Sequence, residues 1–173
     1  CNLARLAWKE IADATKRPED DAEYKRIRDL FVKEFPGHPE HSDQAFGIAR
    51  ELFAKGQYEQ AAQQLADIPT SSRNYWQAQR MVPGCYRQLA IDEKDPAKAK
   101  SWHEKALAAA QNLTATAAKG TADDPQVASS RQTGDLYAAF SLASLVKWPE
   151  ALAAIDAYLS RYGDPLIQRG AEF

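Results

Sequence analysis

The sequence predicts an all-α protein, and three observations favour this class. Among its 173 residues are 32 alanines and 12 glutamines, which form helices readily, but only 17 valines, isoleucines and threonines, which strands prefer. Apolar residues recur at intervals of three and four, the spacing of one face of a helix. Most prolines and glycines fall between these segments. We expect a single domain over residues 1–173, large enough to fold without a metal or a disulfide.

Eight helices are expected, and their boundaries have local causes. Pro36, Gly37 and Pro39 end the second helix, because neither proline nor glycine continues one well. Ser42 is the expected N-cap of the third helix, and Pro96 opens the sixth. The expected helices span, in order, about residues 2–15, 18–35, 42–55, 58–68, 72–92, 96–118, 125–146 and 148–162.

Pro83 and Gly84 lie inside the fifth of these segments. A proline in a helix interior removes one hydrogen bond and costs roughly 3 kcal/mol. The segment is therefore either one kinked helix or two shorter helices. We favour the kink, because the apolar residues Ala78, Val82 and Cys85 stay in phase across the proline.

Three of the turns share one pattern: a polar residue or glycine, a nearby aromatic residue or proline, and an alanine three positions later. They are Gly56, Tyr58 and Ala61; Asp95, Pro96 and Ala99; and Lys147, Trp148 and Ala151. This pattern resembles the tetratricopeptide repeat, in which antiparallel helices cross closely at small residues. The resemblance is strongest over residues 36–69, where nine positions match in phase: Pro36, Pro39, Ala45, Ala49, Leu52, Gly56, Tyr58, Ala61 and Leu65.

The resemblance implies a right-handed α-solenoid of about four antiparallel hairpins, some of them degenerate. From Ala61 to Ala99 and on to Ala151 the spacings are 38 and 52 residues, against about 34 in the family. The excess of alanine is expected to mark close helix crossings, at Ala45, Ala49, Ala61, Ala99, Ala139 and Ala151. The units are expected at 1–40, 41–71, 72–120 and 121–164, and a further helix is expected to begin in 165–173.

No common motif of catalysis or nucleotide binding occurs in the sequence. The eight glycines are scattered along the chain and do not form a phosphate-binding loop. A Gly-x-Ser-x-Gly elbow is absent, and three histidines offer few pairings of a nucleophile with a base. We therefore expect a protein that is not an enzyme and that carries no cofactor.

One cluster has the residue types of a metal site, namely His38, Glu40, His41 and Asp43. Pro39 separates the two histidines, and no helix fixes their spacing as zinc enzymes require. We expect a polar turn between repeats, in which Asp43 helps to cap a helix, and no metal. A divergent zinc or nickel site at His38 and His41 is the alternative.

Charge and hydropathy limit the partners. The chain has 22 basic and 24 acidic residues, and its net charge of −2 disfavours nucleic acid, which selects a basic surface. No apolar run reaches about 18 residues, so no transmembrane segment is expected. A soluble, bacterial-type domain in the cytoplasm or periplasm follows, with a lipid anchor on Cys1 as a minor alternative. A piece of a longer repeat array fits both ends of the chain better.

In the tetratricopeptide family, the first helix of each hairpin lines a concave groove. Arginine and aromatic residues dominate binding hot spots, and here arginines recur at 73, 80 and 87. We therefore expect a protein-interaction module whose groove binds a peptide or a partner protein with apolar and acidic side chains. The expected contact residues are Phe46, Arg50, Phe53, Trp76, Arg80, Arg87 and Phe140.

Two alternatives remain open at this point. The arginines can form a solvated face while the phenylalanines pack against neighbouring repeats. The whole domain can also be a structural spacer or an oligomerisation domain of a larger chain, for which a homodimer is the simplest assembly.

Overall fold

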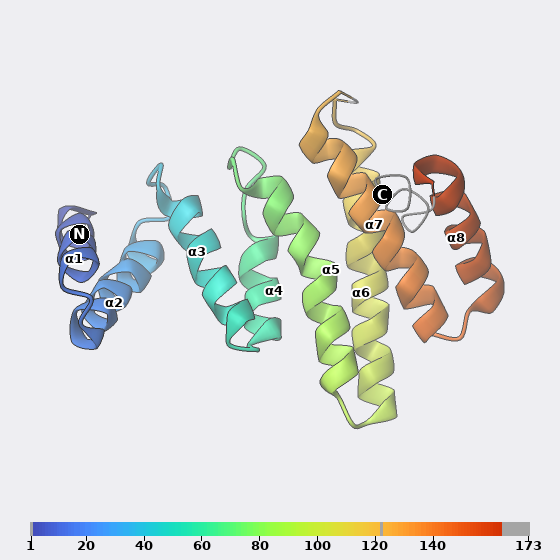
Figure 1. Ribbon diagram of the computed structural model, residues 1–173, viewed down its shortest axis with the longest axis horizontal. Coiled ribbons are helices and arrows are strands. Elements are labelled where there is room, and N and C mark those ends of the chain that lie inside the picture. Colours follow the sequence, from blue (N-terminus) through green and yellow to red (C-terminus); the bar gives the residue numbers. More distant parts are fainter. Residues whose placement is uncertain (1, 122, 164–173) are drawn as a thin grey trace, which may run out of the picture.

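The computed structural model describes residues 2–121 and 123–163, and within them it contains eight helices and no strand (Figure 1). The prediction of an all-α protein is confirmed. The helix expected to begin in residues 165–173 lies outside the described residues. The helices are α1 (Asn2–Thr15), α2 (Pro18–Glu34), α3 (His41–Ala54), α4 (Tyr58–Ala66), α5 (Tyr75–Asp92), α6 (Pro96–Ala117), α7 (Pro125–Ser144) and α8 (Trp148–Tyr162).

Consecutive helices pack against one another and form a row that runs from α1 to α8 (Figure 1). Packing is most extensive between α6 and α7. Helix α5 also contacts α7 directly, although α6 lies between them in the sequence. These three helices therefore form one block. Among consecutive helices, α2 and α3 share the least extensive packing. The joint between them divides α1 and α2 from the rest of the row.

Two helix starts test the predicted caps. The carboxylate of Asp95 accepts a hydrogen bond from the backbone N–H of Ala97 at 2.8 Å, so α6 begins where predicted. The predicted N-cap at Ser42 is wrong, because α3 begins one residue earlier, at His41. Glu40 occupies the N-cap position with helical backbone angles and no capping hydrogen bond from its side chain.

The helix α5 continues through Pro83, so the fifth segment is one helix and not two. Pro83 is buried, and the neighbouring Gly84 lies against Tyr137 of α7. A Cβ atom on Gly84 would lie 3.1 Å from the Tyr137 hydroxyl oxygen. The Pro83 and Gly84 pair therefore sits at the contact between α5 and α7.

The three turns that share a sequence pattern also share a structural position. Tyr58, Pro96 and Trp148 are the first residues of α4, α6 and α8. The alanine three positions later is buried in α4 and α8 and partly buried in α6. A repeated pattern in the sequence thus corresponds to a repeated helix hairpin.

Small residues allow the helices to approach closely. Gly134 of α7 faces α6, where a Cβ atom would lie 2.8 Å from the carbonyl oxygen of Ala110. Such a distance is shorter than real Cβ contacts, so the observed crossing requires glycine. Of the six alanines expected at close helix crossings, five are buried, namely Ala45, Ala49, Ala61, Ala139 and Ala151.

Two buried arginines hold α1 and α2 to the following unit. Arg5 of α1 is 2 % exposed and pairs with Glu40, while its guanidinium carbon lies 5.2 Å from the centroid of the Phe31 ring. Arg28 of α2 is 5 % exposed and pairs with Glu51 of α3. Ion pairs therefore supplement the less extensive packing at this joint.

Candidate binding surface

The seven expected contact residues lie on three helices that are not adjacent in sequence. Phe46, Arg50 and Phe53 belong to α3, and Phe140 belongs to α7. Three more lie on α5, namely Trp76, Arg80 and Arg87. The structure brings residues of α5 and α7 into contact, whereas the residues of α3 have separate surroundings.

Both phenylalanines of α3 contribute to packing. Phe46 is only 6 % exposed and belongs to the main hydrophobic core, together with Leu65 of α4. Phe53 is partly buried, and its ring meets the edge of the Tyr58 ring with 5.2 Å between centroids. The alternative in which the phenylalanines serve packing therefore applies to both side chains.

Arg50 points away from that core. It is exposed, and its guanidinium carbon lies 6.0 Å from the centroid of the Phe46 ring. Arg50, Gly47, Glu51 and Ala54 line a hollow of about 360 Å³ on α3. A Cβ atom on Gly47 would meet no atom within 4 Å. The outer face of α3 is therefore open around Arg50.

Arg80 connects α5 to the start of α7. Its Nη2 donates to the Gln126 side-chain oxygen at 2.9 Å, and its Nη1 donates to the Gln126 carbonyl at 3.2 Å and to Ser130 Oγ at 3.3 Å. All three acceptors are uncharged. Burial lowers the pKa of Arg80 below its ordinary value, although a guanidinium stays protonated near neutral pH.

Arg87 and Phe140 form the clearest contact between predicted site residues. The guanidinium carbon of Arg87 lies 5.5 Å from the centroid of the Phe140 ring, within the range of cation–π attraction. Phe140 is still 47 % exposed. Trp76 lies near the start of α5, where its partly buried ring packs against Tyr75 with 5.0 Å between centroids.

The three arginines among the expected contact residues differ from most other arginines, because they form no ion pair within the described residues. Of the ten arginines within the described residues, six form ion pairs with carboxylates: Arg5, Arg17, Arg26, Arg28, Arg73 and Arg161. Arg50, Arg80 and Arg87 are among the four that have no carboxylate of the described residues within ion-pair distance. The three helices thus present three guanidinium groups whose charge is not neutralised by this part of the chain.

Residues of the candidate metal cluster interact with other side chains of the protein. Glu40 pairs with Arg5, and Asp43 accepts hydrogen bonds from Arg73 and Asn74. The ring of His38 meets the edge of the Phe31 ring. Within residues 2–121 and 123–163, no group of three or more histidine, cysteine or acidic side chains is arranged to hold a metal ion.

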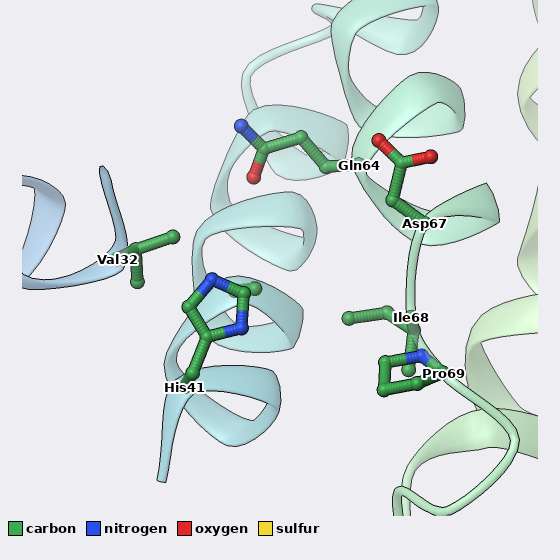
Figure 2. Close-up of a pocket in the computed structure, with 7 residues that line it drawn as sticks. Val32, His41, Gln64, Asp67, Ile68 and Pro69 are labelled. Carbon is green, nitrogen blue, oxygen red and sulfur yellow. The ribbon is translucent and has the colours of Figure 1, made fainter. Parts of the chain in front are cut away.

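Sequence reasoning missed a small pocket between α2 and the hairpin of α3 and α4. Figure 2 shows Val32 on one side of it, His41 near the start of α3, and Gln64 and Asp67 on the α4 side. The pocket has a volume of about 180 Å³, and the Gln64 Oε1 atom is buried without a hydrogen-bond partner among the described residues. These residues are far apart in the sequence and share no motif, so nothing in it pointed to the pocket.

Fold and packing together define a class: an all-α protein whose described helices pack successively along the chain. No model of a known protein family, no curated protein and no solved structure matches this chain significantly. None of the helices within the described part of the chain is both long and apolar enough to cross a membrane.

Proposed function

We propose that this chain is a tetratricopeptide-like α-solenoid domain that binds a peptide segment of a partner protein and catalyses no reaction. The peptide lies over α5 and α7, with Arg50 of α3 as a further contact, and it carries both acidic and apolar side chains. One observation carries the proposal. Arg50, Arg80 and Arg87 have no carboxylate partner in the described chain, whereas six other arginines do.

The electrostatics at Arg80 favour an acidic ligand. Its hydrogen-bond acceptors are neutral, and Gln126 lies in the first turn of α7, where the helix dipole is positive. A partly buried cation next to a helix N-terminus is unfavourable unless an anion compensates it. The N-cap carboxylate of Asp124, which accepts from the Gln126 backbone N–H at 2.8 Å, offsets part of the dipole but forms no ion pair with Arg80. A carboxylate on the peptide would supply that compensation and would form a charge-assisted hydrogen bond.

The surroundings of Arg87 favour an apolar side chain beside the acidic one. Phe140 offers about half of its surface to a ligand, and Arg87 already lies over its ring. Burial of exposed aromatic surface next to a guanidinium is typical of binding hot spots. We therefore assign the apolar part of the peptide to Phe140 and the acidic part to Arg80, Arg87 or Arg50.

Selection from a random peptide library displayed on phage tests this proposal. We expect the selected peptides to be enriched in aspartate and glutamate next to aromatic or aliphatic residues. Arg87→Ala and Phe140→Ala should each weaken binding of these peptides by about tenfold or more, as truncation of hot-spot residues does.

Arg26→Ala is the matched control, because Arg26 is an exposed arginine that pairs with Glu23 on α2. It should leave binding unchanged. Peptides of no common charge, or equal loss of binding in all three variants, would contradict the proposal.

A further inference from the structure

The last helix carries a row of exposed apolar side chains. Trp148, Leu152, Ile155 and Leu159 of α8 are 56, 60, 40 and 40 % exposed. The buried residues of α8, Ala151 and Tyr158, lie beside this row, on the flank of the helix that packs against α7. Large apolar side chains normally face a core, and a contiguous exposed row of them is typical of an interaction site. We call these four residues the α8 stripe.

We propose that the α8 stripe binds a second copy of this chain, with the two α8 helices antiparallel about a twofold axis. This inference is independent of peptide binding, because α8 contains none of the residues assigned to the peptide. In Figure 1, α8 lies at one edge of the row of helices, next to α7.

The residue spacing of the stripe suits pairing with an antiparallel copy of the same helix. Its residues follow one another at intervals of four, three and four, the a/d spacing of helices that pack side by side. This series reads the same in both directions. An antiparallel copy therefore places Ile155 opposite Leu152 and Leu159 opposite Trp148, twice each. A twofold interface requires self-complementarity of this kind.

Charge opposes the contact only at the exposed Asp156, which borders the stripe four residues after Leu152. The stripe contains no ionisable side chain, and Arg161 near the end of α8 pairs with Asp135 of α7. Antiparallel α8 helices also place the positive end of each helix dipole beside the negative end of the other.

The area available sets the strength of the dimer. Together with Val146, which is 67 % exposed just before α8, the stripe offers on the order of 400 Å² per copy, given its large side chains and their exposed fractions. Both copies would bury roughly 800 Å², which is less than the roughly 1,000 Å² that a stable interface needs and is compatible only with a transient contact. The dimer should therefore be weak, reversible and dependent on concentration.

Sedimentation velocity of the 173-residue chain between about 5 and about 500 µM tests the proposal, because a weak dimer forms by mass action over this range. We expect the weight-average mass to rise from monomer towards dimer. Leu152→Lys and Ile155→Glu, measured separately, should both remain monomeric. An equimolar mixture of the two should regain dimer, because the antiparallel register places residue 152 of one copy opposite residue 155 of the other.

Leu3→Lys is the matched control, because Leu3 is the most exposed large apolar residue among the described ones and lies on α1, remote from α8. It should dimerise as the natural chain does, and circular dichroism should show that all variants remain helical. A natural chain that stays monomeric overturns the proposal and assigns the stripe to another segment or protein. Loss of the dimer in Leu3→Lys, which indicates head-to-tail contact, or a mixture that stays monomeric, also overturns it.

Discussion

Arg28 of α2 and Glu51 of α3 form an ion pair across the joint between the first two helices and the rest of the row, with 3.1 Å between Nη2 and Oε2. Arg28 also donates to Asp29 at 3.0 Å, so its buried guanidinium contacts two carboxylates. The hydrogen bond from Arg28 lowers the pKa of Glu51 below its ordinary value of 4.5. Since α2 and α3 share the least extensive packing of any consecutive helices in the row, we expect this ion pair to contribute to holding them together.

The lowered pKa of Glu51 predicts a dependence of stability on pH. A carboxylate with a depressed folded-state pKa stabilises the fold above its unfolded pKa, and this stability is lost as the pH falls through the folded value. Glu51→Gln should therefore lower the free energy of unfolding near pH 7 by about 1 kcal/mol, a modest value because solvent partly screens Glu51. It should also reduce the loss of stability below pH 4.5.

Urea unfolding at a series of pH values measures both effects. Glu104→Gln is the control, because Glu104 is an exposed carboxylate of α6 with no ion pair among the described residues. If Glu51→Gln and Glu104→Gln show the same acid dependence as the natural chain, the pair does not stabilise this joint.

The close crossing of α6 and α7 predicts that Gly134 cannot be enlarged. Gly134→Ala would place a Cβ atom 2.8 Å from the carbonyl oxygen of Ala110 and 3.0 Å from the backbone nitrogen of Thr114. Backbone atoms cannot move aside cheaply, so we expect a loss of about 1–3 kcal/mol in unfolding free energy. Thermal unfolding followed by circular dichroism measures this loss.

Gly47→Ala is the matched control within a helix. A Cβ atom there would meet nothing within 4 Å, and alanine favours a helix over glycine by roughly 0.5–1 kcal/mol. This variant should be more stable than the natural chain. A Gly134→Ala variant that is also stabilised would show that α6 and α7 do not cross as closely as described.

Cys85 is predicted to be chemically inert in the folded chain. Burial raises the pKa of its thiol to about 12, and its side chain is 0 % exposed. The thiolate is the reactive form, so at pH 8 a thiol reagent should modify Cys85 only when the chain opens. In a Cys1→Ser variant, labelling should be slow in buffer and immediate in concentrated urea. Rapid labelling in buffer would contradict the burial of Cys85 in the hydrophobic core.

Local signals explain why most helix boundaries could be predicted. Asp95 before Pro96 has both the capping carboxylate and the fixed backbone angle of a helix start, and α6 begins there. Ser42 has the same chemistry as a good cap, but Glu40 already adopts helical angles and α3 starts before it. The residue type alone suggests an N-cap. Whether that residue caps the helix depends on the backbone angles of the residues before it.

Side-chain depth could not be predicted, because it depends on distant partners. Helical spacing does not tell which face of α1 is buried: Leu3 is exposed, and Arg5 is buried because Glu40, 35 residues away, neutralises it. Phe46 likewise turns into the core. The spacing of the arginines at 73, 80 and 87 is visible in the sequence, but their counter-charges are not. Arg73 pairs with Asp43, whereas Arg87 lies over the Phe140 ring and has no carboxylate of the described residues within ion-pair distance.

The most direct measurement of the proposed function is a nitrogen-15 amide shift titration of the chain with a selected acidic and aromatic peptide. Binding at the proposed face should cause the largest shifts on α5 and α7, around Arg87, Phe140 and the Arg80 contact with Gln126. Amides of α8 should shift little at concentrations where the chain is monomeric. Shifts centred on α8 or around the pocket at His41, with α5 and α7 unchanged, would contradict the assignment of this face to peptide binding.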